Sequence, residues 1–157
     1  MSANYSIDTS SIIEAWHRRY PLDAFPGLWQ GIDELVSLGR LQASEEVRQE
    51  LKKKDDELYA WAKERPQLFR EADLENQLAV RSILQSHPKL VNTQKGRSQA
   101  DPFVIALARV RKCVVVTNEV ALGSLDRPRI PDVCHALGIS CINFLGLIRQ
   151  EKWIFHR

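Results

Sequence analysis

The stretch Cys113-Val114-Val115-Val116-Thr117 places the strongest constraint on how this chain can fold. Its β-branched residues favour a strand. It also lacks the polar alternation of a strand that has one face in water, and such an uninterrupted apolar run is typical of a parallel strand covered on both faces. The rest of the chain therefore has to supply further parallel strands and the helices that cover them.

Short strand candidates alternate with segments of helical spacing along the chain. Besides 113–117, strands are expected over residues 4–8, 41–43 and 139–142. Helices are expected over residues 11–20, 27–38, 44–64, 73–86, 101–110, 131–137 and 144–150. This alternation predicts an α/β fold of three layers, α/β/α, with a mainly parallel sheet and right-handed crossovers. We expect 4–8 and 113–117 to be its central strands.

Composition and length agree with one soluble domain over residues 1–157. The chain has 44% hydrophobic and 27% charged residues, which is ordinary for a globular protein. No apolar run reaches the roughly 20 residues of a membrane helix, and no signal peptide is recognisable. Three scattered cysteines, Cys113, Cys134 and Cys141, favour buried free thiols over a disulfide framework or a zinc site. A cytoplasmic location is therefore expected.

Charge is divided unevenly along the chain, although the net charge is only +2. Residues 1–88 carry eleven Lys/Arg against fifteen Asp/Glu, and residues 89–157 carry eleven against five. The basic second half is compatible with a nucleic-acid partner, and equally with an ordinary solvated surface.

Asp8 follows the first predicted strand and precedes two small hydroxyl residues, Thr9 and Ser10. In open α/β folds, ligands bind in the crevice beyond the carboxyl ends of the strands, so Asp8 is a candidate functional residue. The alternative is that one of these three residues only caps the following helix.

Three further acidic residues occupy comparable positions. Glu50 lies in the helix after strand 41–43, Asp101 begins a buried helix, and Glu119 follows strand 113–117. Structural alternatives exist for each: Glu50 can pair with Lys54, Asp101 can be an N-cap before Pro102, and Glu119 can be an exposed loop residue. Together, however, clustered carboxylates repel one another unless a cation neutralises them. Oxygen ligands without histidine or thiolate favour Mg²⁺ or Mn²⁺.

These motifs, in this order, resemble those of the PIN-domain nucleases. The matching stretches are Ile7-Asp8-Thr9-Ser10, Ala43-Ser44 with Val47 and Glu50-Leu51, Ala100-Asp101 with Ile105-Ala106-Leu107-Ala108, and Val115-Val116-Thr117-Asn118-Glu119. The chain looks most like the single-domain toxin ribonucleases of bacterial and archaeal toxin–antitoxin pairs. The stretches Pro26-Gly27-Leu28-Trp29 and Ile130-Pro131-Asp132-Val133-Cys134 resemble a PIN-like branch of unknown function. The resemblance spans roughly residues 4–145.

The resemblance implies a site and an activity. Asp8, Glu50, Asp101 and Glu119 match the four acidic positions at which the family binds metal and performs catalysis. The family commonly has aspartate where Glu119 stands, so Asn118 and Asp126 remain alternatives for that position. Thr9, Ser10 and Thr117 match its small polar positions. The implied protein is an endoribonuclease that hydrolyses RNA phosphodiester bonds with Mg²⁺ or Mn²⁺.

Partners also follow from the resemblance: an RNA substrate, a cognate antitoxin of a type II pair and a second copy in a homodimer. Arg97, Arg127 and Arg129 lie on expected loops, where they would meet RNA phosphates or only solvent. The helices over 27–38 and 44–64 carry large side chains that either anchor an interface or fill the core: Trp29, Leu58, Tyr59 and Trp61.

Two other classes of protein compete with the nuclease hypothesis. The first is a catalytically inactive PIN-like module that binds RNA or protein, and the departure at Glu119 leaves it open. The second is an aspartyl-phosphate phosphatase or receiver domain. Such a phosphatase usually has a second aspartate where Ser10 stands, and a receiver domain needs a late strand-end lysine that we cannot identify.

Overall fold

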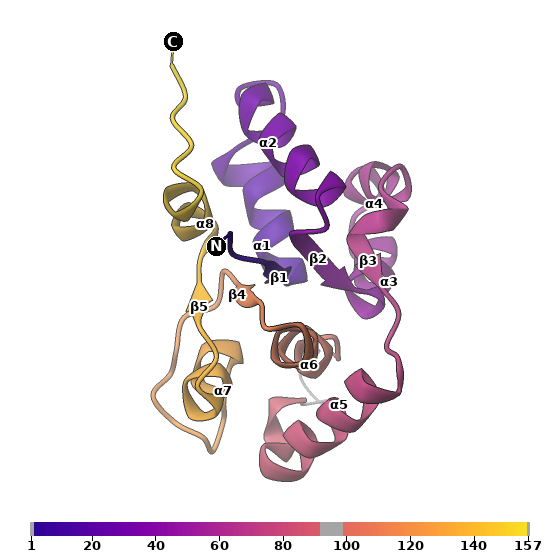
Figure 1. Cartoon of the computed structure of the whole chain (residues 1–157), viewed down its shortest axis with the longest axis vertical. Coiled ribbons are helices and arrows are strands. Elements are labelled where there is room, and N and C mark those ends of the chain that lie inside the picture. The colour runs from indigo at the N-terminus through magenta and orange to yellow at the C-terminus, as the bar shows by residue number, and fades with distance from the viewer. Residues whose placement is uncertain (1, 92–98, 157) are drawn as a thin grey trace.

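A computed structural model of this chain describes residues 2–91 and 99–156, and within them a five-stranded sheet runs through the middle of the molecule (Figure 1). The strands are β1 (Tyr5–Ile7), β2 (Leu41–Ser44), β3 (Phe69–Arg70), β4 (Val114–Val116) and β5 (Cys141–Ile142). Their order is β3-β2-β1-β4-β5, and every neighbouring pair is parallel. The prediction that the first strand and the valine-rich strand lie inside a parallel sheet is confirmed.

Helices cover both faces of this sheet. They are α1 (Thr9–Glu14), α2 (Pro26–Ser37), α3 (Glu45–Lys54), α4 (Asp56–Lys63), α5 (Leu74–Ser86), α6 (Asp101–Arg111), α7 (Ile130–Leu137) and α8 (Phe144–Gln150). Figure 1 shows α5, α6 and α7 on one side of the sheet and α1, α2 and α8 on the other, which confirms the three-layer α/β/α architecture. In the described part of the chain, no helix is long and apolar enough to cross a membrane.

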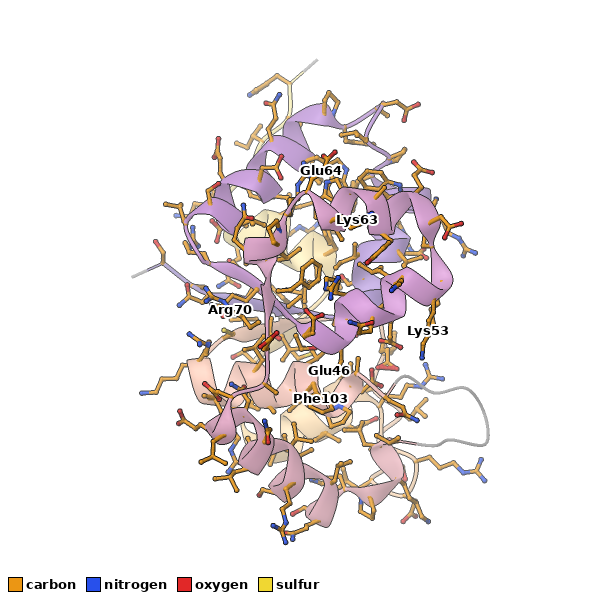
Figure 2. All side chains as sticks on the ribbon, turned by 90° about the vertical axis from the view of Figure 1, so that its right-hand side faces the viewer. Glu46, Lys53, Lys63, Glu64, Arg70 and Phe103 are labelled. Carbon is orange, nitrogen blue, oxygen red and sulfur yellow. The ribbon has the colours of Figure 1, made fainter. Side chains whose placement is uncertain are left out.

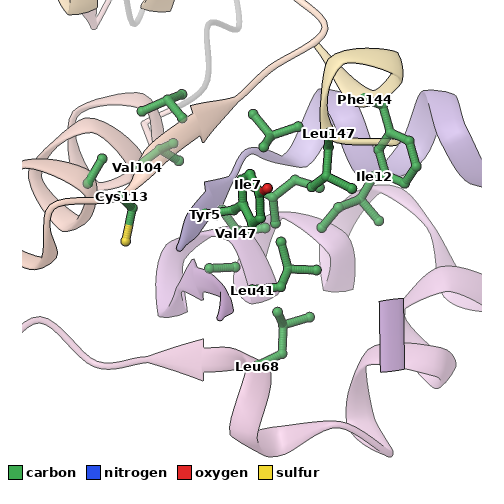
Figure 3. Packing of buried hydrophobic residues seen from close by; sticks show 14 of the residues in the cluster. Tyr5, Ile7, Ile12, Leu41, Val47, Leu68, Val104, Cys113, Phe144 and Leu147 are labelled. Carbon is green, nitrogen blue, oxygen red and sulfur yellow. The ribbon is translucent and has the colours of Figure 1, made fainter. Parts of the chain in front are cut away.

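The central strand β1 is fully enclosed, as Figure 3 shows for Tyr5 and Ile7. Tyr5 lies in register with Leu41 on one side and Val114 on the other. Ser6 is buried on the opposite face, where its hydroxyl donates to the backbone carbonyl of Val104 at 2.9 Å and so satisfies its polar atom. This packing fixes the point at which Asp8 leaves the sheet.

An aromatic cluster fills the layer between the sheet and α1, α2 and α4. The ring centroids of Trp16 and Trp29 are 5.1 Å apart, and those of Trp29 and Trp61 are 5.6 Å apart, both in edge-on contact or close to it. Trp29 donates to the backbone carbonyl of Tyr20 at 2.7 Å, so its indole nitrogen is also satisfied. Trp29, Leu58 and Trp61 are buried in the core, and of the four proposed interface residues only Tyr59 keeps partial exposure.

Several predicted boundaries are wrong. The helix expected over 44–64 is two helices, because Asp55 is extended (φ −155°) and caps α4 through the backbone N–H of Leu58 at 3.0 Å. The helix expected over 11–20 begins at Thr9 and ends in a π-helical turn, Ala15–Arg19. Strand β3 was not predicted, since two residues carry too little propensity to be recognised.

Two of the three free cysteines, Cys113 and Cys134, are buried, and Cys141 is half-buried.

Candidate functional site

The carboxyl ends of β1 and β4 open into a cleft of about 460 Å³. Its lining consists of Asp8, Thr9, Ser10, Ile13, Glu14, Lys54, Asp101, Asn118, Glu119 and Arg129. Three of the four predicted acidic residues, Asp8, Asp101 and Glu119, therefore share this cleft. The fourth, Glu50, adjoins it, because Glu50 contacts both Thr9 and Lys54.

Asp8 is held by neighbours on three sides. One carboxylate oxygen accepts the backbone N–H of Ser11 at 2.8 Å, which is the N-cap bond of α1. The hydroxyl of Ser10 donates to the carboxylate at 3.0 Å, and that of Thr117, at the end of β4, donates to its other oxygen. The capping interpretation of Asp8 is thus correct, and the same side chain also lines the cleft.

Burial raises the pKa of Asp8 to about 7, and it outweighs the opposing hydrogen bonds from Thr117, Ser11 and Ser10. The negative charge of Glu119 raises it further. Near neutral pH this carboxyl group is therefore poised between its two protonation states. A cation in the cleft would favour the ionised form.

Glu50 belongs to α3 and contacts the first residue of α1, Thr9. Its carboxylate accepts the hydroxyl of Thr9 at 2.7 Å and lies 3.5 Å from the ammonium nitrogen of Lys54. The predicted alternative, a pair with Lys54, is therefore present, together with a contact to the residue that follows Asp8. Lys54 is exposed to solvent and also lines the cleft.

Asp101 is not the N-cap that the Asp-Pro sequence suggested. Ala100 occupies the N-cap position, and Asp101 is the first residue of α6, with Pro102 second. Proline is tolerated there because the N–H groups of the first turn have no partner within the helix. Asp101 is buried and lines the cleft. Its carboxylate is thus placed beside the positive end of the helix dipole.

Glu119 and its neighbours form the opposite wall. The backbone N–H of Glu119 donates to the hydroxyl of Thr117 at 3.1 Å, and its carboxylate accepts the N–H of Ile130, at the start of α7, at 3.4 Å. Asn118 also lines the cleft, whereas Asp126 is an exposed residue further along the loop. Of the three candidates for the fourth position, Glu119 and Asn118 therefore reach the cleft.

The loop between β4 and α7 is fastened by a residue to which the sequence assigned no role. Both carboxylate oxygens of Asp132 accept backbone N–H groups, from Leu122 at 3.1 Å, Gly123 at 2.9 Å and Arg129 at 2.9 Å. Burial opposes ionisation, but these three donors outweigh it and hold the pKa of Asp132 below its ordinary value. The signal was available, because an acid in the first turn of a helix commonly bonds the N-cap backbone.

Glu14 was not predicted as a residue of the cleft, whereas Arg129 was a candidate. Glu14, on α1, lines it and pairs with Arg18 at 3.8 Å and Arg19 at 3.4 Å. Arg129 lines it from the loop, as expected for one of three candidate arginines. Arg127 is exposed, and Arg97 lies outside the described residues.

The donor chemistry of the cleft fits a hard divalent cation. Asp8, Asp101, Glu119 and Asn118 offer oxygen ligands, and Mg²⁺ is commonly held by one or two carboxylates with several waters. In the described part of the chain, no three His, Cys, Asp or Glu side chains stand close enough together to hold a metal ion. The described carboxylates therefore line the cleft without forming a ready-made ligand cage.

Comparison with solved structures finds the same fold in the crystal structure of VapBC2 from Rickettsia felis bound to a DNA fragment from the promoter. The TM-score is 0.52 with 13% sequence identity, over 89% of this chain and 98% of that one. The shared architecture is the three-layer α/β/α fold. No curated protein matches the sequence. Over residues 5–155, the sequence matches the family described as "Domain of unknown function (DUF4411)", and the chain belongs to that family.

Proposed function

We propose that this protein is a metal-dependent endoribonuclease that hydrolyses RNA phosphodiester bonds. One observation carries the proposal: a buried carboxylate, Asp8, ends the central strand with its pKa raised to about 7 and shares a cleft with Asp101 and Glu119. Perturbed pKa values of this kind concentrate at functional sites. The likeness of the fold to a VapBC2 structure adds support for a nuclease of the PIN class.

In this proposal, Mg²⁺ or Mn²⁺ would be held by Asp8, with Asp101, Glu119 and Glu50 directly or through water. When bound, such an ion lowers the pKa of water and stabilises charge on a phosphoryl group. The chain's own residues prepare the site. Thr117 and Ser10 orient the Asp8 carboxylate, and Thr9 orients that of Glu50.

The two cationic side chains of the cleft, Lys54 and Arg129, would meet the RNA backbone. They line the same cleft as the carboxylates. Phosphate contacts position a nucleic acid without reading its sequence, and arginine matches phosphate geometry with two parallel donors. Their role in the proposal is to set the scissile phosphate over Asp8.

The test is cleavage of a labelled RNA by the purified full chain with Mn²⁺, with Mg²⁺ and with EDTA. Asp8→Asn, purified identically, controls for contaminating ribonucleases. We expect metal-dependent cleavage by the wild type only. Equal cleavage by both proteins, or none by either under any metal, would refute the enzymatic proposal.

We further propose that the protein is the toxin of a type II toxin–antitoxin pair and is inhibited by a co-encoded antitoxin. In this proposal it acts in the cytoplasm and is a homodimer in isolation. The likeness to VapBC2 supports this role. Induced expression should arrest growth with the wild type but not with Asp8→Asn, and a small DNA-binding protein encoded alongside should relieve the arrest. Sedimentation as a monomer at micromolar concentration would remove the dimer.

A second candidate is a catalytically inactive PIN-like module that binds RNA or protein. One observation favours it, namely that the described residues include no ready-made group of three ligating side chains. This candidate predicts RNA binding that EDTA leaves unchanged and that is never followed by cleavage. The same assay, run beside a gel-shift measurement, therefore separates the two.

A further inference from the structure

Lys54 brings a positive charge to a cleft whose lining includes four acidic residues, Asp8, Glu14, Asp101 and Glu119. It is the last residue of α3, and its ammonium nitrogen lies 3.5 Å from a carboxylate oxygen of Glu50. Lys54 also lines the cleft together with Asp8, Asp101 and Glu119. An amine in this position competes for the same carboxylate as any cation that enters.

The backbone around Lys54 is held in place from both sides. Glu50 precedes Lys54 by one helical turn, in the orientation that favours an ion pair on a helix. Asp55, the next residue, leaves the helix in an extended conformation, caps α4 and contacts the imidazole of His17. The side chain of Lys54 is therefore directed from a fixed point on the cleft wall rather than from a loose helix end.

Thr9 and Lys54 differ in kind as partners of Glu50. The hydroxyl of Thr9, at 2.7 Å, orients the carboxylate and leaves its charge unchanged. The ammonium of Lys54 neutralises that charge, and at 51% side-chain exposure it can swing away into solvent, whereas Glu50 is only 15% exposed. Thr9 can thus stay in place while Lys54 is replaced.

We propose that Lys54 is the resident counter-ion of the cleft: it neutralises Glu50 when no divalent cation is present and is displaced from Glu50 when one binds. This inference rests on the proposed function in taking the cleft as a divalent-cation site. It adds that the chain sets its own cation affinity, because each entering ion has to displace the amine. The ordinary alternative is a pair that only supports α3.

The test compares Lys54→Met with Lys53→Met in the full chain, without RNA. Lys53 is the preceding residue and is exposed, and Figure 2 shows it at the outer end of α3. Both variants lose one positive charge from the same helix turn, so their difference isolates the contact with Glu50. Mn²⁺ affinity is measured by titration calorimetry and by the loss of the free-ion electron paramagnetic resonance signal.

We expect Lys54→Met to bind Mn²⁺ about three- to fivefold more tightly than the wild type, as suits a partly exposed pair. Lys53→Met should stay within about 1.5-fold of wild type, since exposed charges are well screened. Equal or weaker binding by Lys54→Met, an equal gain in both variants, or no measurable binding by the wild type would overturn the inference.

A double-mutant cycle with Glu50→Gln sharpens the test. Glutamine keeps an oxygen for the hydroxyl of Thr9 but carries no charge for Lys54. In this background, Lys54→Met should no longer tighten Mn²⁺ binding, and a persistent gain would overturn exchange at Glu50. Because the binding test uses no RNA, the two proposals can fail separately. Failure of RNA cleavage would refute the proposed function alone. An unchanged Mn²⁺ affinity of Lys54→Met, in a protein whose wild type cleaves RNA, would refute this inference alone.

Discussion

The two walls of the cleft are built in different ways. On one wall, Asp8 follows a strand end and its partner Ser11 belongs to the first turn of α1; Glu50, on α3, adjoins this wall through its bond with Thr9 of the same turn. On the other wall, Glu119 lies in an irregular segment between β4 and α7. That segment exposes apolar side chains to solvent: Val120, Leu122 and Leu125.

Different interactions hold the two walls in place. The first wall is part of regular elements whose backbone is packed into the core, so its geometry survives small changes in side-chain chemistry. The second wall depends on Asp132, which collects three backbone N–H groups of the loop. Substitutions in the first wall should therefore act on charge and chemistry with the fold intact, whereas substitution of Asp132 should act on the second wall through the order of the loop.

The largest effect is expected from Asp8→Asn. Cleavage should fall at least about a thousandfold, roughly 4 kcal/mol of transition-state stabilisation. The metal-free fold should be at least as stable as wild type, and the gain should grow as pH rises, because asparagine also caps a helix and carries no buried charge. Thermal melts with and without Mn²⁺ check this: wild type should gain about 2.7 kcal/mol at a hundredfold excess over Kd, and Asp8→Asn should gain none. An equal gain in both proteins would remove Asp8 from the cation site.

The second prediction concerns pH. The pKa of Asp8 is about 7 in the folded chain against an ordinary 3.8, so between these values the folded state keeps a proton that the unfolded state releases. Stability from Asp8 is thus present below pH 4 and is lost as pH rises through 7, by on the order of 3–4 kcal/mol. Urea unfolding in EDTA at pH 5 and pH 8 tests this through the difference between wild type and Asp8→Asn. A pH-independent difference would contradict the buried-charge account.

Asp132→Ala tests the second wall. Loss of three N–H partners of one carboxylate should destabilise the chain by roughly 2–4 kcal/mol. Hydrogen exchange should quicken at the amides of Leu122, Gly123 and Arg129. Asp126→Ala, in the same loop, is the control and should leave these amides protected. Unchanged exchange in Asp132→Ala would show that the loop is held by other contacts.

A smaller effect is expected at Thr9. Thr9→Val keeps the side-chain shape but loses the hydroxyl that bonds Glu50, a change of about 1 kcal/mol, so cleavage should fall about fivefold. Thr9→Ser keeps the hydroxyl and should retain most activity. The melting temperature separates the two contributions, because a mainly structural role would lower stability and leave kcat intact. Equal activity of the valine and serine variants would argue against orientation of Glu50 by Thr9.

The smallest effect is expected at Asp126. Its exposed position away from the cleft predicts that Asp126→Asn leaves cleavage and the Mn²⁺ response unchanged. Glu119→Gln, in contrast, should reduce cleavage about tenfold or more, because its carboxylate lines the cleft. If Asp126→Asn lowered cleavage more than Glu119→Gln, Asp126 would be the fourth acidic residue, and the loop would have to rearrange when RNA binds.

The sequence by itself determined the parallel sheet and the place of Asp8 in it. The apolar run at 113–117 and the short strand at 4–8 are local patterns, and parallel strands bring their carboxyl ends to one edge. The order of acidic motifs then pointed to Asp8, Glu50, Asp101 and Glu119, of which all but Glu50 line one cleft. The strands could be predicted from local sequence because the periodicity of strands and helices is a property of neighbouring residues.

Only the tertiary structure decided which polar residues meet. Thr9 and Glu50 are separated by 41 positions and Thr117 and Asp8 by 109, so no local pattern encodes their hydrogen bonds. The same holds for Lys54, whose place in the lining of the cleft no local pattern shows. Likewise, only the structure shows that Glu119 and Asn118 line the cleft while Asp126 is exposed in the loop that the Asp132 carboxylate fastens.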